Sequence, residues 1–168
     1  EESKIFDTED FAYHEVTVER PLRLSFQATP EAIETLQESK PFTSIATSKK
    51  KAEPARSQEI EKGKHLQDAI IGTLKGLGSE RVFLNRDEFI DLLREGIKER
   101  GRKISLPVLR KIVEELGVRN PDAGICLDTK GKPEPDSGLH DTEQIPFRED
   151  IEAYFQREVI PYAPDAWI

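Results

Sequence analysis

Three consecutive segments between residues 57 and 119 carry apolar side chains at helical spacing, and each pattern ends at a glycine. The positions are Leu66, Ile70, Leu74 and Leu77 before Gly78, Phe89, Leu93 and Ile97 before Gly101, and Leu109, Ile112, Val113 and Leu116 before Gly117. Spacings of three and four place such residues on one side of an α-helix, and glycine commonly ends one. We expect helices over 57–77, 86–100 and 105–116, the last capped by Ser105. Short connections favour antiparallel neighbours and hence a small bundle.

The N-terminal segment 4–27 has a different period. Its apolar side chains alternate with polar ones at Val16, Val18, Leu22, Leu24 and Phe26. A period of two predicts extended structure with the apolar set on one sheet face, and Pro21 predicts an interruption of the ladder. Thr29 followed by Pro30 predicts the start of a short helix that buries Ile33 and Leu36 and ends before Pro41.

The rest of the chain predicts loops and one further helix. Residues 43–56 are poor in apolar side chains and include three consecutive lysines, which predicts a loop. Residues 120–146 are rich in Pro, Gly and Asp, with a short strand expected at 125–127 and a turn at Lys130-Gly131. A last helix is expected over 147–158, with Phe147, Ile151, Phe155 and Val159 on one side, before a proline-rich extended tail.

These patterns predict an α+β fold that is mainly helical, with a small antiparallel β-ribbon packed against a bundle of about four helices. We expect a β-ribbon and short helix in 1–40, a loop or linker in 41–56, a helical bundle segment in 57–119, and a loop, final helix and extended tail in 120–168. A length of 168 residues fits one domain overall.

Composition limits the class of protein. No apolar run approaches the length of about 18 residues that a membrane span needs, so we expect no membrane partner. Cys126 is the only cysteine, which excludes an internal disulfide and fits a reducing, cytoplasmic location. The sequence begins at Glu1 and contains no Met, which is typical of a processed or truncated start, so we expect a fragment of a longer protein.

Charge is unevenly distributed along the chain. The net charge is -8, yet residues 94–119 contain eight basic and four acidic side chains. The candidate DNA or partner contacts are Arg94, Lys98, Arg102, Lys103, Arg110 and Lys111. The simpler interpretation is a solvated helical face, because Glu95 and Glu99 accompany these cations and no aromatic residues are interleaved. A free-standing nucleic-acid-binding module that uses residues 94–111 is the alternative function.

The sequence predicts no catalytic, cofactor-binding or metal-binding residue in this chain. Gly76-Leu77-Gly78 follows a helix pattern and lacks the third glycine of a phosphate-binding loop. The histidines are scattered, and Lys130 and Lys132 interrupt the acidic loop 128–143 where a calcium loop needs oxygen ligands. A hydrolase whose site forms only in space is a third and weaker option.

Two stretches resemble the C-terminal part of the modification subunit of type I restriction–modification systems. The first stretch comprises Lys4–Phe11 (KIFDTEDF) and Val16–Leu24 (VTVERPLRL). The second comprises Cys126–Asp128, Lys130–Asp136 (KGKPEPD), Pro146–Ile151 (PFREDI), Tyr154-Phe155, Arg157–Pro161 (REVIP) and Pro164–Trp167 (PDAW). Together they cover somewhat under half of the chain, and residues 40–120 carry no motif of that family. Ala12 stands before Tyr13 where the family often has glycine.

The resemblance implies a parent protein that is an N6-adenine DNA methyltransferase using S-adenosylmethionine. That family holds the flipped adenine with an Asn-Pro-Pro-aromatic motif. Here Asn120-Pro121 is followed by Asp122, so no catalytic or cofactor residue carries over, and we expect this fragment not to be an enzyme. The resemblance implies an accessory docking region, with the specificity and restriction subunits as partners and DNA reached through the assembled complex.

Overall fold

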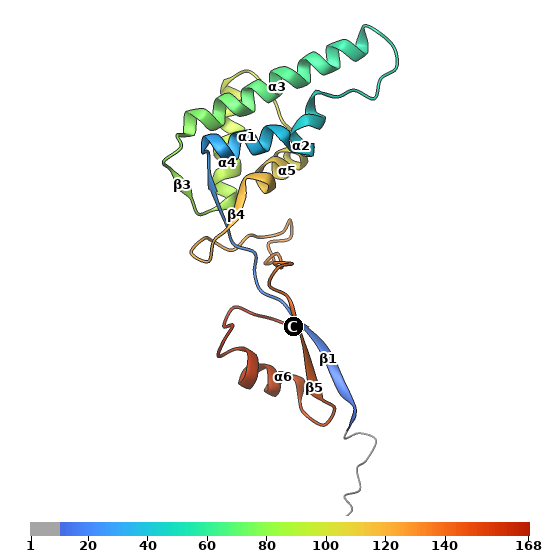
Figure 1. Ribbon diagram of the computed structural model, residues 1–168, viewed down its shortest axis with the longest axis vertical. Helices are drawn as coiled ribbons and strands as arrows, with labels where there is room; N and C mark the ends of the chain where they lie inside the picture. Colours follow the sequence, from blue (N-terminus) through green and yellow to red (C-terminus); the bar gives the residue numbers. More distant parts are fainter. Residues whose placement is uncertain (1–10) are drawn as a thin grey trace, which may run out of the picture. The chain divides into compact units, whose positions relative to one another are not determined.

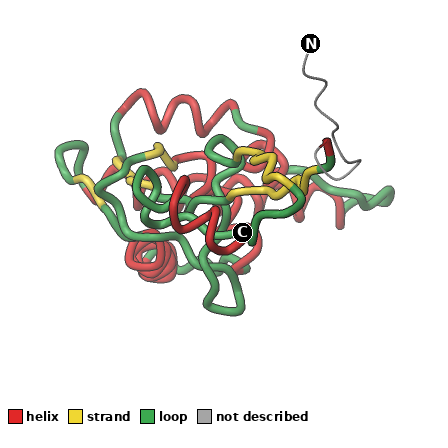
Figure 2. The backbone as a smooth tube through the Cα atoms, turned by 90° about the horizontal axis from the view of Figure 1, so that it is seen from below, coloured by secondary structure: helices red, strands yellow, loops and turns green. Residues whose placement is uncertain are grey.

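The computed structural model describes residues 11–168 and has an α+β, mainly helical fold, as the sequence predicts (Figure 1). The chain divides into two compact units. We call Arg23–Gly124 the helical unit. The second, which we call the ribbon unit, combines the N-terminal segment up to Leu22 with Ile125–Ile168. Strands are short in both units (Figure 2).

The helical unit contains the three helices that the apolar patterns predict, with ends within two residues of the predicted ones. They are α3 (Ala55–Leu77), α4 (Arg86–Glu99) and α5 (Leu106–Leu116). Before them come α1 (Pro30–Glu38), α2 (Lys40–Thr43) and the 3-10 turn η2 (Ser44–Ala46). A small antiparallel sheet has the order β3 (Val82–Phe83), β2 (Leu24–Gln27) and β4 (Gly117–Arg119).

Local capping explains where these helices begin and end. The Thr29 side chain accepts a hydrogen bond from the Ala32 N–H, as its position before Pro30 predicts. Asn85 caps α4 by accepting from two backbone N–H groups of the first turn. At the other end of α4, Gly101 has a φ of 71°, a conformation that side chains with a Cβ disfavour. The Gly101 and Arg102 N–H groups then donate to the carbonyls of Lys98 and Ile97 and close the helix.

The core of the helical unit lies between the helices and the small sheet. Phe26 of β2 is fully buried and stacks on Phe89 of α4, with ring centroids 4.8 Å apart. The predicted apolar stripes of α4 and α5 are buried, as are Ile33 and Leu36 of α1. On α3 the central pair Ile70 and Leu74 is fully buried, which confirms its predicted inward side.

The ribbon unit is built on one antiparallel strand pair. β1 (Tyr13–Val18) pairs with β5 (Asp141–Pro146) along its whole length, from Tyr13 opposite Pro146 to Val18 opposite Asp141. After β5 come α6 (Ile151–Tyr154) and the π-helical turn η3 (Phe155–Val159). Val18, Phe155 and Val159 form the buried cluster of this unit.

Some sequence expectations are wrong in detail. The alternating segment does not form one sheet face, because β1 and β2 belong to different sheets on either side of the predicted interruption at Pro21. Residues 4–10 of that segment lie outside the described residues. The strand expected at 125–127 is reduced to isolated bridge residues at Ile125 and Leu127, of which Leu127 pairs with Pro133 around the predicted turn. The loop expected over 43–56 begins later, since η2 extends the helical structure to Ala46.

The last helix also begins later than expected. It starts at Ile151, because Pro146–Asp150 form a turn and the Asp150 carboxylate accepts from the Ala153 N–H as a cap. Phe147 is therefore outside the helix and 45% exposed, and its ring stacks on His14. Within residues 11–168 no helix has both the length and the apolar character that a membrane crossing requires.

Candidate interaction surfaces

The segment Glu19–Leu22 joins the distant parts of the ribbon unit. Glu19 exchanges two backbone hydrogen bonds with Trp167, at 2.9 and 3.0 Å. The Arg20 carbonyl accepts from the Asp136 N–H at 2.8 Å, and Leu22 donates to Glu134. One short extended segment is thus hydrogen-bonded both to the C-terminal tail and to the Pro-rich loop.

An ion pair reinforces this junction. The Arg20 Nε donates to the Asp165 carboxylate at 3.0 Å, between side chains that are 37% and 25% exposed. Such a partly exposed pair contributes up to about 1 kcal/mol, so its main effect is to fix the position of the tail. Arg20 and Asp165 belong to the two separate stretches on which the expected family resemblance rests. The structure therefore brings the described residues of both stretches, apart from Arg23 and Leu24, into one unit.

The acidic loop of this unit is ordered by its own backbone. The Asp128 Oδ1 accepts from the Lys130 and Lys132 N–H groups at 2.7 and 2.9 Å. These hydrogen bonds, led by that from Lys132, hold the pKa of Asp128 below its ordinary value. Across residues 11–168 no three His, Cys, Asp or Glu side chains gather as metal ligands would.

The two units differ strongly in charge. The helical unit contains 19 basic and 16 acidic side chains, a net charge of +3, whereas the rest of the chain contains 6 and 17, a net charge of -11. The acidity of the chain therefore resides in the ribbon unit. The helical unit alone has the sign of charge that favours an anionic ligand.

The structure distributes the six predicted contact residues over different environments. Arg94 and Lys98 lie exposed on α4, where they form ion pairs with Asp91 and Glu95 at 2.8 and 3.3 Å. This arrangement is the solvated helical face that the sequence analysis favours as the simpler interpretation. Arg110 is half-buried on α5. The other three, Arg102, Lys103 and Lys111, line hollows on the helical unit.

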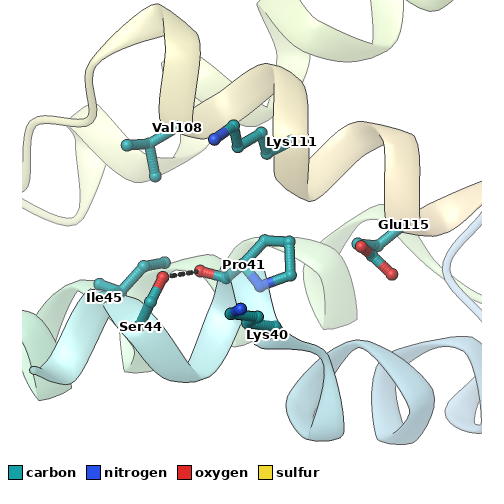
Figure 3. Close-up of a pocket in the computed structure, with 7 residues that line it drawn as sticks. All are labelled: Lys40, Pro41, Ser44, Ile45, Val108, Lys111 and Glu115. Atoms are coloured by element: carbon teal, nitrogen blue, oxygen red, sulfur yellow. Dashed lines mark hydrogen bonds between the residues drawn. The ribbon is translucent and has the colours of Figure 1, made fainter.

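Lys111 lies in a groove of about 540 Å³ between α5 and the segment formed by α2 and η2 (Figure 3). Val108 and Glu115 accompany it on α5. The facing wall comprises Lys40, Pro41, Ser44 and Ile45. The groove is thus an apolar trough with two lysines and one glutamate at its border. Lys40 is a cation that the sequence analysis did not select.

Arg102 and Lys103 line a second hollow, of about 380 Å³, with Lys62 and Gly63 of α3. Ile45 lines both this hollow and the groove beside Lys111, so the two are neighbours. Lys62 is also absent from the sequence-based candidates, because it lies on α3, far from the basic segment in sequence. Only the packing of α3 beside the turn after α4 brings these cations together.

A third surface contains residue types found in hydrolase sites. Ser57, His65 and Asp68 line one side of α3. Eight residues separate Ser57 from His65, which is about 12 Å along a helix axis and far beyond a hydrogen bond. The Ser57 hydroxyl instead donates to Glu53 at 2.6 Å. This surface therefore does not form a nucleophile–base pair.

Comparisons of the chain with protein-family models, with curated proteins and with solved structures found no match.

Proposed function

We propose that this chain is a non-catalytic C-terminal accessory and docking region of a type I modification methyltransferase. The observation that carries the proposal is the assembly of the ribbon unit. Its two halves are separated by the whole helical unit in sequence, and they carry most of the family resemblance. They meet through the β1–β5 pairing, the Glu19–Trp167 hydrogen bonds and the Arg20–Asp165 ion pair.

Contacts within the resembling residues support this interpretation. A chance likeness in two separate stretches gives no reason for their side chains to meet. Here an arginine from VERPL pairs with the aspartate of PDAW, and the proline of VERPL lies opposite a proline of KGKPEPD. These contacts between the two stretches within one compact unit support the proposal.

The proposal assigns the chemistry to another part of the parent protein. S-adenosylmethionine and the target adenine would bind a separate catalytic domain. This chain would contact the specificity and restriction subunits and would meet DNA through the assembled complex. The location would be cytoplasmic.

Exposed aromatic residues give the ribbon unit a surface suited to docking. Tyr13 is 53% exposed, and its strand partner Pro146 precedes Phe147, which is 45% exposed. Both residues lie at the same end of the β1–β5 pair, where the Phe147 ring stacks on His14. Aromatic side chains are enriched at the energetically dominant positions of protein interfaces, so this end is the proposed contact for the specificity subunit.

Calorimetric titration of the full chain with the cognate specificity subunit tests the proposal. Truncation of an aromatic anchor costs about 2 kcal/mol, so the Tyr13→Ser, Phe147→Ser double variant is expected to bind at least about tenfold more weakly. The control is Val118→Ser, which removes a side chain 66% exposed on the helical unit and is expected to change affinity less than about twofold.

Two outcomes contradict the proposal. The docking role is wrong if the wild-type chain gives no complex with the specificity subunit. The non-catalytic role is wrong if the isolated chain binds S-adenosylmethionine in the same calorimeter. The alternative, a nucleic-acid-binding module using 94–111 as one face, has less support because Arg94 and Lys98 are paired with acidic neighbours.

A further inference from the structure

Three cations line the hollow beside η2, and no acidic residue lines it with them. Lys62 comes from α3, and Arg102 and Lys103 come from the turn between α4 and α5. The remaining lining residues are Ile45, Gly63, Leu66 and Gly101, none of which carries charge. Within residues 11–168 none of the three cations forms an ion pair.

The backbone holds these cations in place from both sides. The two hydrogen bonds that close α4 fix the chain at Gly101 and Arg102, directly before Lys103. On the facing side, Gly63 lets α3 contact η2 closely, since an added Cβ would clash with the Ile45 carbonyl and lie 2.7 Å from the Ala46 Cα. The hollow is therefore built by fixed backbone, while its charged side chains extend from it.

Electrostatics gives this arrangement a preferred ligand. Cations that share a hollow repel one another, and this repulsion is relieved when an anion binds between them. Arg and Lys are the side chains that most often contact phosphate, Arg through its planar guanidinium and Lys as a point charge. The helical unit as a whole, at +3, adds to the attraction.

The neighbouring groove favours a polymer over a free anion. Lys40 and Lys111 border that groove, which shares Ile45 with the basic hollow, and they also form no ion pair within residues 11–168. Glu115 is the one acidic residue of the combined lining. A single small phosphate would occupy only one of these open sites, whereas a nucleic-acid strand offers phosphates in series.

We propose that the hollow formed by Lys62, Arg102 and Lys103 binds a backbone phosphate of nucleic acid, and that Lys40 and Lys111 contact a neighbouring phosphate. The contact is to the phosphate backbone of the nucleic acid, so it carries no preference for a base sequence. It is independent of the docking proposal, because it uses only the helical unit and is measured without the specificity subunit.

Fluorescence anisotropy with a labelled duplex of about 20 base pairs, at about 50 mM salt, tests this site because backbone binding is strongest at low salt. The Lys62→Gln, Arg102→Gln, Lys103→Gln triple variant is expected to raise the Kd at least about tenfold and to make the log–log salt slope shallower by about one to three. Replacement by the alternative cation, as Lys62→Arg, Arg102→Lys, Lys103→Arg, is expected to retain binding within about threefold.

The matched control removes the same charge elsewhere on the helical unit, as Arg56→Gln, Lys64→Gln, Lys75→Gln on the exposed side of α3, and is expected to change the Kd less than about threefold. Circular dichroism checks that all three triple variants are folded. If the Gln triple in the hollow and the control triple weaken binding equally, the effect comes from net charge alone. That result would overturn the proposed site. The proposal is also overturned if the wild-type chain does not bind the duplex. Binding of inorganic phosphate without binding of the duplex would overturn it as well.

Discussion

At the residue scale, hydrogen bonding decides which side chains cap the helices. Both Asn85 and Ser105 precede helices, and both are residue types favoured at that position. Asn85 Oδ1 accepts from the Asp87 and Glu88 N–H groups at 2.9 and 3.0 Å, whereas the Ser105 side chain makes no capping hydrogen bond. Residue type alone therefore does not give the energy of a cap.

The two caps predict different costs of truncation. Asn85→Ala removes the acceptor of two N–H groups and is expected to lower the free energy of unfolding by about 1 kcal/mol. Ser105→Ala removes no hydrogen bond of that kind and is expected to change it by less than about 0.5 kcal/mol. Urea unfolding of both variants measures the difference. Equal effects would show that hydrogen bonding does not determine the value of these caps.

The hydrogen bonds of Asp128 predict that the stability of the ribbon unit depends on pH. The Lys132 and Lys130 N–H groups stabilise its charged form, so its pKa in the folded chain lies below the ordinary value of 3.8. The stabilisation is present above pH 3.8 and is lost as the pH falls through the folded pKa. An NMR titration of the Asp128 carboxyl group is expected to give a midpoint below 3.8. A midpoint at or above that value would mean that the two hydrogen bonds do not favour the carboxylate.

At the element scale, α3 contains glycines with opposite structural roles. Gly63 is buried against η2, where an added Cβ would meet backbone atoms of Ile45 and Ala46. At Gly76 the nearest foreign atom is the Arg100 guanidinium, at an ordinary 3.6 Å. Glycine weakens a helix in both places, but only at Gly63 does close packing require it.

The same substitution should therefore have opposite signs along one helix. Gly63→Ala is expected to lower the free energy of unfolding by about 1–3 kcal/mol, because the backbone of η2 must move. Gly76→Ala is expected to raise it by up to about 1 kcal/mol through helix propensity. Thermal unfolding of the two variants measures both shifts. Stabilisation by Gly63→Ala would show that η2 does not pack against α3 as described.

Sequence periodicity predicted the helices, because the apolar residues that each helix buries lie close together in sequence. The stripes on α4 and α5 repeat every three or four residues, and those residues are buried as expected. Periodicity could not assign β1 and β2 to different sheets, because strand partners such as Asp141–Pro146 lie far away in sequence. It could not select Lys62 and Lys40 either, since their proximity to the predicted cations results from helix packing.

At the scale of the whole molecule, charge and resemblance divide along the same boundary. The unit that carries most of the resemblance has a net charge of -11 in sequence, and the inserted helical unit has a net charge of +3. The two proposals follow this division, with docking assigned to the ribbon unit and phosphate contact to the helical unit. Each unit can therefore be tested without assuming the role of the other.

Hydrogen–deuterium exchange of the full chain, free and bound to the cognate specificity subunit, tests the docking role most directly. Backbone amides on open strand edges exchange readily until a partner covers them, so slower exchange in the complex reports the contact surface. The docking proposal predicts slower exchange in Tyr13–Val18 and Asp141–Pro146, with the amides of α3, α4 and α5 unchanged. Absence of protection in the ribbon unit, or protection confined to the helical unit, would contradict it.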